Sequence, residues 1–212
     1  PYSGLSIREQ HAFGAITGSF YVADKVVFID TFFIFNRKGT NQFFISLSNA
    51  DYAMLIGGTA FDPLDIAAKT SSPDLIQTIE DLRGELWLIG ALTAEVWFNS
   101  GDIDFPFARQ PGVLVEHGML RGWSAIEVDV FVFFLSRDTE GQCIVVRSEG
   151  YQVVRVSTHA IETEFSSYAV VNDAIAMVFQ QDGHTFYLIV FPSADKTWAY
   201  DITSGEWHEW TW

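Results

Sequence analysis

The chain has 212 residues and a net charge of −15, from 27 acidic against 12 basic residues. Hydrophobic residues make up 49% of it, which argues against disorder because burying them offsets the lost chain entropy. The charge argues against a protein that holds nucleic acid by its phosphates, since that needs clustered Lys and Arg. No apolar run approaches the ~20 residues of a membrane helix, and no signal peptide is visible. The chain begins at Pro1 rather than Met, as a fragment or a trimmed product would.

The strand pattern begins near residue 21, after twenty poorly patterned residues. Ile, Val and Phe dominate three short runs, as buried pleated surfaces favour; these runs are 25–30, 32–36 and 42–47. The segment that follows, 49–74, contains Gly57-Gly58 and two prolines. It is predicted to be a surface loop with one short helical turn.

Two further groups of strands follow in the same style. The second group is predicted at 75–82, 86–90 and 95–99, and is followed by a turn-rich segment, 100–112. The third group is predicted at 125–130, 132–136, 142–147 and 151–156. Gly stands at the turn tips of the third group, as short hairpins favour. Residues 157–172 connect to the last group, and amphipathic helices are not expected anywhere.

The last forty residues give the clearest unit. Four strands are predicted there, at 175–179, 185–191, 196–202 and 206–212, and Gly, Pro, Asp or Ser closes the first three. Such a run forms an antiparallel meander. The corresponding central strands of the four groups begin near Phe32, Leu86, Val132 and Thr185. Their spacing of roughly 45 to 55 residues is in the range of propeller blades.

The fold prediction is therefore all-β and β-propeller-like, with antiparallel four-stranded blades, either incomplete or a fragment of a longer protein. One domain over 1–212 is expected. Its blade-like units lie near 21–57, 75–112, 123–157 and 173–212. A β-sandwich or barrel made from the same strands is the alternative.

Two carboxylate pairs have a spacing that an acid and a base could use in catalysis. Asp102 and Asp104, and likewise Glu127 and Asp129, are two residues apart, which would place each pair on one face of an extended strand. Glycosidase propellers use axial carboxylates in this way. A chain with 27 acidic residues also produces such pairs by chance, and this is the interpretation adopted here. No catalytic, metal or cofactor residue is predicted.

The histidines do not have the spacing of a zinc site, and no zinc, nucleophile or phosphate-loop motif occurs. They are His11, His117, His159, His184 and His208. The single cysteine, Cys143, is expected to be a buried structural thiol. The Arg residues are scattered singly, which suits local ion pairs better than a phosphate track.

The aromatic residues are the densest signal. Four tryptophans gather near the C-terminal end: Trp198, Trp207, Trp210 and Trp212. Packing between blades and at an interface is the preferred interpretation, since Trp suits half-buried positions. Stacking of sugars on exposed indoles is the alternative.

Three stretches carry a resemblance to a known family. ELWLIG followed by EVWFNSGDIDFPF lies within 73–109, STHAIE lies within 153–162, and GHTFY, DKTWAYD and GEWHE lie within 180–209. In this order they resemble the packaged-DNA stabilisation proteins of short-tailed bacteriophages. The resemblance covers most of 25–212, and family members are longer than this chain.

The resemblance implies a structural virion protein rather than an enzyme. Such a protein closes the portal vertex, extends the tail channel and retains packaged DNA. The implied partners are the portal and its adaptor ring above, a needle or plug below, and further copies in a ring. Sequence-specific nucleic acid, membranes and cofactors are not expected. The protein would be made in the bacterial host cytoplasm and reside in the virion. A carbohydrate- or receptor-binding propeller is the alternative.

Overall fold

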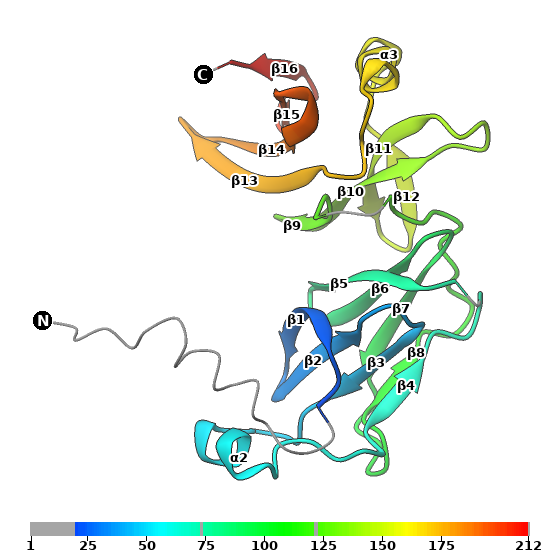
Figure 1. The fold of residues 1–212 in the computed structure, drawn as a ribbon, viewed down its shortest axis with the longest axis vertical. Coiled ribbons are helices and arrows are strands. Elements are labelled where there is room, and N and C mark those ends of the chain that lie inside the picture. The colour runs from blue at the N-terminus through cyan, green and yellow to red at the C-terminus, as the bar shows by residue number, and fades with distance from the viewer. Residues whose placement is uncertain (1–19, 73, 121–122, 212) are drawn as a thin grey trace, which may run out of the picture.

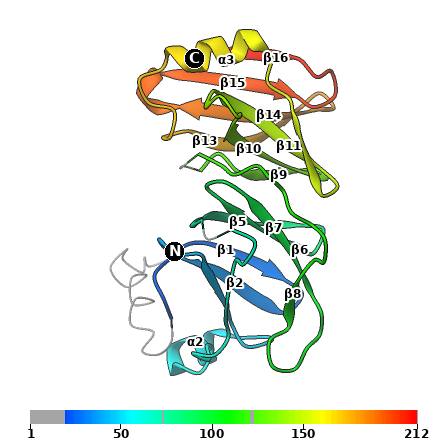
Figure 2. The same cartoon turned by 90° about the vertical axis from the view of Figure 1, so that its right-hand side faces the viewer.

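The computed structural model describes residues 20–72, 74–120 and 123–211. It contains four separate antiparallel sheets, each made of four strands that are consecutive in the sequence. In Figures 1 and 2, the first and the last of these sheets along the chain lie at opposite ends of the long axis, with the other two between them. The all-β, propeller-like prediction is confirmed, as an open arc of blades. The sandwich or barrel alternative is wrong because the strands form four separate sheets.

The strands follow the chain from one sheet to the next. Sheet 1 contains β1 (Ala23–Ile29), β2 (Phe32–Arg37), β3 (Gln42–Ile45) and β4 (Ile66–Ala68). Sheet 2 contains β5 (Ile76–Leu82), β6 (Glu85–Gly90), β7 (Ala94–Asn99) and β8 (Phe107–Arg109). Sheet 3 contains β9 (Ile126–Val128), β10 (Phe131–Arg137), β11 (Cys143–Glu149) and β12 (Gln152–Arg155). Sheet 4 contains β13 (Ile175–Gln181), β14 (His184–Phe191), β15 (Lys196–Asp201) and β16 (Trp207–Trp210).

Two helices and one 3-10 turn complete the described chain. Helix α2 (Tyr52–Gly57) begins where Asp51 accepts a hydrogen bond from the backbone of Met54, and ends at Gly58 in the left-handed conformation. It confirms the short helical turn expected in 49–74. The other elements are α3 (His159–Ser167) and η2 (Pro192–Ala194). Neither helix has the length and apolar character needed to cross a bilayer.

The sequence predictions missed three elements. Strands β4 and β8 have three residues each and lie in segments interpreted as loops, because so short a run has no readable alternation. Helix α3 contradicts the expectation of no amphipathic helix. Its nine residues bury only Ile161, Glu162 and Phe165, too few to define a period. Sheet 1 also extends beyond residue 57, the predicted end of the first unit. The single-domain division stays a prediction, and residues 1–19 lie outside the described residues.

Equivalent residues in the four sheets can be matched through a shared turn. In every sheet the first two strands are joined by two residues. The third residue of the second strand is the equivalent position in each sheet. In sheets 1 to 4 these residues are Ile34, Trp87, Phe133 and Phe186. Ile34, Trp87 and Phe133 are completely buried, each in the apolar cluster between its sheet and the next. We call this side of a sheet its forward face, and the opposite side its rear face.

The rear face of each sheet packs against the forward face of the sheet before it. The residues one position further along the second strand are Leu88, Phe134 and Tyr187, and all three are buried against the preceding sheet. In sheet 1 the equivalent is Phe35, whose ring contacts the rings of Phe20 and Phe61 instead. The core is therefore three clusters between sheets plus a cap on the outer part of sheet 1. Each sheet buries both faces only when it has a neighbour on either side.

Buried polar groups fix the junction between sheets 1 and 2. Glu95 of β7 is completely buried and accepts hydrogen bonds from the backbone of Thr70 at 2.8 Å, from the indole of Trp97 at 3.0 Å, and from Ser71. Burial acts to raise the pKa of Glu95, but these hydrogen bonds outweigh it and lower the pKa. Lys69, also buried, pairs with Asp74.

The junction between sheets 2 and 3 depends on a close backbone approach. A Cβ added at Gly118 would lie 2.2 Å from the carbonyl carbon of Ala91 and 2.3 Å from the nitrogen of Leu92. The carbonyl of Gly118 also accepts a hydrogen bond of 2.6 Å from the Ser136 hydroxyl. Only glycine therefore lets the connecting segment pass this close to the β6–β7 turn.

We predict that Gly118→Ala lowers the free energy of unfolding by about 1–3 kcal/mol, as overpacking does. Urea titration of both proteins would measure the difference. Gly57→Ala is the matched control, because its added Cβ would meet nothing closer than 4.0 Å. Equal stability losses for the two variants would contradict the proposed close approach.

Glu95→Gln is predicted to lower the free energy of unfolding at neutral pH by about 1.5–3 kcal/mol, the range for hydrogen bonds to a charged group. Because the pKa of Glu95 is lowered, its contribution is complete above the pKa of an unfolded glutamate. It is lost as pH falls through the folded-state pKa. The difference between the two proteins should therefore narrow in acid. Urea titrations from neutral to acid pH would test this, with exposed Glu140→Gln as the control. A difference that does not change with pH would contradict it.

Candidate functional site

The first strands of the four sheets line the inner side of the arc. Strands β1, β5, β9 and β13 contact one another in this order. In the two end sheets, Val26 and Phe28 of β1 and Met177 of β13 face no other sheet of the described chain and are 48%, 52% and 44% exposed. Because this surface collects side chains from all four sheets, it is the natural place for a site that none of them could form alone.

Carboxylates recur at one end of this surface. The first residue of the turn after each first strand has a left-handed backbone, with φ of 53° at Asp30, 56° at Arg83, 59° at Asp129 and 52° at Asp182. Aspartate tolerates this conformation better than most residues with a side chain. The requirement for such a turn therefore places an acidic group at this end in three of the four sheets.

Further carboxylates lie beside those turns on β5 and β9. Glu80 is almost completely buried, and its burial raises its pKa although it pairs with Lys25; the neighbouring Glu127 raises it further. Burial likewise raises the pKa of Asp81 despite a hydrogen bond from the backbone of Gly84, and Asp30 adds to the increase. Repulsion between neighbouring carboxylates adds to these pKa increases. The exposed aspartates of the turns give this end of the inner surface a negative potential.

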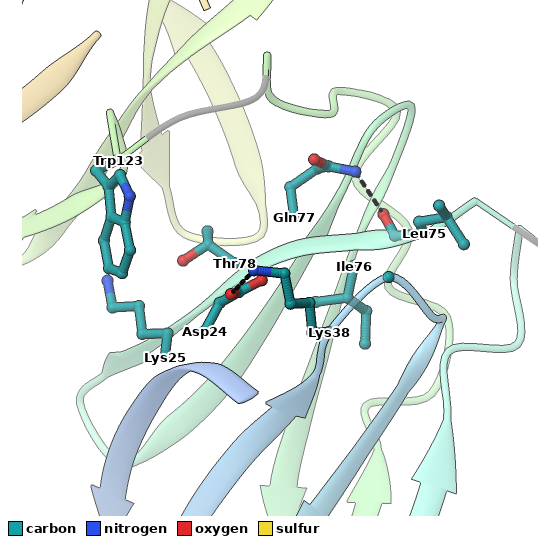
Figure 3. Close-up of a pocket in the computed structure, with 9 residues that line it drawn as sticks. Asp24, Lys25, Lys38, Leu75, Ile76, Gln77, Thr78 and Trp123 are labelled. Atoms are coloured by element: carbon teal, nitrogen blue, oxygen red, sulfur yellow. Dashed lines mark hydrogen bonds and ion pairs between the residues drawn. The ribbon is translucent and has the colours of Figure 1, made fainter. Parts of the chain in front are cut away.

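A cavity of about 430 Å³ lies at the opposite end of β1 and β5. Figure 3 shows its lining, with the ion pair between Asp24 and Lys38, 2.9 Å apart, between Trp123 on one side and Leu75 on the other. Both first strands have an irregular register here, β1 between residues 23 and 26 and β5 between 76 and 78. Such bulges redirect side chains and turn Asp24 and its neighbours toward the cavity.

Trp123 is the most exposed tryptophan of the described chain, at 60%. Its backbone is nevertheless fixed, because its N–H donates to the carbonyl of Ala174 at 3.0 Å and its carbonyl accepts from Ala176 at 2.8 Å. The indole therefore extends from a fixed backbone position and lies beside the polar groups of the cavity. Lys25 and Lys38 are both paired with carboxylates, so the cavity has no surplus positive charge for an anion.

The two carboxylate pairs singled out in the sequence are not brought together. Asp102 and Asp104 lie in the exposed loop between β7 and β8, not on a strand, and the Asp102 side chain accepts a hydrogen bond of 2.9 Å from the backbone of Asp104. Glu127 lies on β9, whereas Asp129 occupies the following turn. Neither pair shares one face of a strand, and their geometry is that of turns rather than of an acid and a base.

The histidines are also separate. His184 lies 2.7 Å from Asp201. Burial acts to raise the pKa of Asp201, but hydrogen bonds from the backbone of Thr203, from Ser204 and from His184 lower it to about 2. His11 lies outside the described residues, and within the described ranges no group of His, Cys, Asp or Glu is suited to hold a metal ion.

The terminal tryptophans pack within sheet 4 and against its neighbours. Trp198 donates to the Tyr168 hydroxyl at 2.9 Å, Trp207 donates to the carbonyl of Val156 at 2.9 Å, and Trp210 lies edge-on to Phe179. The packing interpretation is confirmed for Trp198 and Trp207. Trp210 packs on rings of its own sheet, and Trp212 lies outside the described residues. Cys143 is a buried thiol as predicted; its burial raises its pKa to about 12, which Arg137 opposes and Glu162 reinforces.

Sequence reasoning did not single out Glu80, Asp81 or Trp123. A usable signal for the first two was a pair of acids at the end of an apolar strand, IQTIEDL. The sequence around Trp123 gave no such signal. Trp123 precedes β9, which begins at Ile126, and its exposure depends on the neighbouring sheet.

Comparisons with known proteins agree with this fold. A family model described as "Bacteriophage P22 Gp10, beta-propeller" matches residues 21–212. No curated protein matches the sequence. Among solved structures, an engineered GH43 glycoside hydrolase with endo-xylanase and exo-arabinofuranosidase activity is 12% identical, with a TM-score of 0.37. That match covers 87% of this chain and 40% of the hydrolase chain, so the chain spans less than half of that structure's length.

The family match covers the whole described chain apart from one residue, and its propeller fold agrees with the four stacked sheets. This chain therefore belongs to the phage stabilisation family of structural proteins described as "Bacteriophage P22 Gp10, beta-propeller".

Proposed function

We propose that this chain is a component of the phage tail that closes the portal vertex, extends the tail channel and retains the packaged DNA. The observation that carries the proposal is the family match over residues 21–212. Several copies would surround the tail axis, with the portal and its adaptor ring above and a needle or plug below. The protein would be made in the host cytoplasm and remain in the virion.

The electrostatics of the chain support a role beside moving DNA. A channel component must not bind phosphates tightly, because each such contact would slow the passage of DNA. The chain has a net charge of −15, and the exposed carboxylates of Asp30, Glu127 and Asp129 lie at one end of its inner surface. We expect the surface that faces the DNA to be acidic as well.

This role is tested by infecting cells with phage in which the gene is disabled and measuring nuclease protection of the DNA in the resulting heads. We predict heads that fill and then lose their DNA, because the vertex is not closed. Complementation with the intact gene should restore protection. Heads that keep their DNA but fail to attach to cells would contradict the proposal and favour receptor binding.

Carbohydrate binding is the second candidate, and the exposed Trp123 beside a polar cavity is the observation that favours it. Aromatic faces and nearby polar groups are what sugars need for stacking and hydrogen bonding. Under this alternative, glucose, galactose or mannose would quench the tryptophan fluorescence of the chain, and Trp123→Ala would abolish the effect. Trp207→Phe is the control, because Trp207 packs in the core. Unchanged fluorescence with all three sugars would dismiss this alternative.

A further inference from the structure

Two carboxylates face each other across the junction of sheets 2 and 3. Glu80 of β5 is the cross-strand partner of Trp87, so it lies on the forward face of sheet 2. Glu127 of β9 is the cross-strand partner of Val132, so it lies on the rear face of sheet 3. Trp87 and Val132 are buried in the same apolar cluster between these sheets. The two glutamates therefore lie on opposite sides of one interface, at its inner edge.

A single lysine supplies positive charge at this edge. Lys25 of β1 forms an ion pair with Glu80, which is only 5% exposed. Figure 3 shows the Lys25 side chain pointing toward Trp123, which precedes β9. Glu127 is exposed and has no ion-pair partner among the described residues. One cation thus stands beside two carboxylates.

The other charged groups around the pair are mostly negative. Asp81 follows Glu80 on β5, and Asp30 and Asp129 occupy the turns after β1 and β9. Arg83 lies in the turn after β5, but it forms no ion pair within the part of the chain that the structure describes. These groups therefore add to the repulsion at the inner edge of the junction.

The effect of this repulsion on stability has the opposite sign to that of Glu95. Burial raises the pKa of Glu80, Lys25 opposes the increase, and Glu127 adds to it. Burial also raises the pKa of Glu127, and Asp81 adds to that increase. A carboxyl group with a raised pKa destabilises the folded protein above its folded-state pKa, and this cost is relieved as pH falls through that pKa. Glu95, with a lowered pKa, instead loses its contribution in acid.

The outer part of the same junction has few polar contacts to offset the repulsion. A cavity of about 320 Å³ lies there, between residues 114–117 and 151–153. Tyr151 donates a hydrogen bond of 2.6 Å to Glu85 of sheet 2. The apolar cluster must therefore supply most of the attraction between sheets 2 and 3, and the charges at the inner edge act against it.

We propose that Glu80, Glu127 and Lys25 form a proton-responsive contact, which joins sheets 2 and 3 more tightly when one of the two glutamates carries a proton than when both are ionised. With both ionised, one lysine faces two negative charges. Binding of a proton leaves one positive and one negative charge, and the repulsion between the sheets is relieved. Sheets 2 and 3 each have both neighbours in the described chain, so the contact does not depend on what covers the ends of the arc. The proposal goes beyond the tail role, which assigns no response to pH.

A double-mutant cycle of Glu80→Gln and Glu127→Gln measures the contact directly. Urea titrations of the unmodified chain, the two single variants and the double variant should reveal a repulsive coupling at neutral pH. We expect it to change the unfolding equilibrium constant by roughly threefold or more. The coupling should disappear below the ordinary pKa of glutamate, because the pair is then protonated. The cycle subtracts the separate cost of removing the Lys25 ion pair.

Glu127→Gln alone should raise the urea midpoint at neutral pH, because it removes a repelling charge that has no ion-pair partner. Glu140→Gln is the matched control, since Glu140 is exposed in the β10–β11 turn of the same sheet, and it should leave the midpoint unchanged. Hydrogen exchange followed by mass spectrometry would locate the effect. In the Glu127→Gln variant, peptides from β5, β9 and β10 should gain protection, whereas those from β15 and β16 should not.

Three results would overturn the proposal. A coupling that is the same in acid as at neutral pH would mean that it does not arise from ionised carboxylates. A lower midpoint for Glu127→Gln at neutral pH would mean that Glu127 stabilises the fold. Protection that rises equally in all four sheets would place the effect outside this junction. None of these results would affect the proposed tail role, since that role is tested by the loss of DNA from heads.

Discussion

The structure depends on the burial of sheet faces against one another. A four-stranded sheet rich in Ile, Val and Phe on both sides cannot satisfy either face in water. It must have a neighbour in front and a neighbour behind. Ile34, Trp87 and Phe133 meet this requirement at equivalent positions in three successive sheets. The segments that connect the sheets must fit this packing. Glu95 accepts hydrogen bonds at the junction of sheets 1 and 2, and Gly118 allows a close backbone approach at the junction of sheets 2 and 3.

The need to bury the sheet faces also separates the residues that pack between sheets from those that line the inner surface of the arc. The faces between sheets are mostly apolar, so most of the charge lies at the turns, the outer edges and the inner side of the arc. Asp30, Asp129 and Asp182 illustrate this, because the left-handed turn selects aspartate and also places it at the inner surface. A protein built in this way carries exposed acidic groups at the turns of its inner surface. That suits the structural role of its phage family.

The strands were predictable because their residue types and turn glycines are local signals. The face of each strand that points forward could not be predicted. A strand such as ELWLIG (β6) buries almost every residue, so its sequence does not alternate between apolar and polar residues. Glu95 and its donors Thr70 and Ser71 lie 25 and 24 residues apart, so their buried contacts exist only after the sheets have packed. For the same reason the exposed Trp123 could not be separated from the packed Trp198 and Trp207 by sequence alone.

The most direct test of the account is an electron cryo-microscopy map of the purified virion. The account predicts density for this chain in several copies around the tail axis below the portal, in which every sheet face that is open in the isolated chain is covered. Absence of the chain from mature particles would contradict its role as a structural virion protein. Sheets whose apolar faces remain exposed to solvent in the particle would contradict the packing constraint on which the account rests.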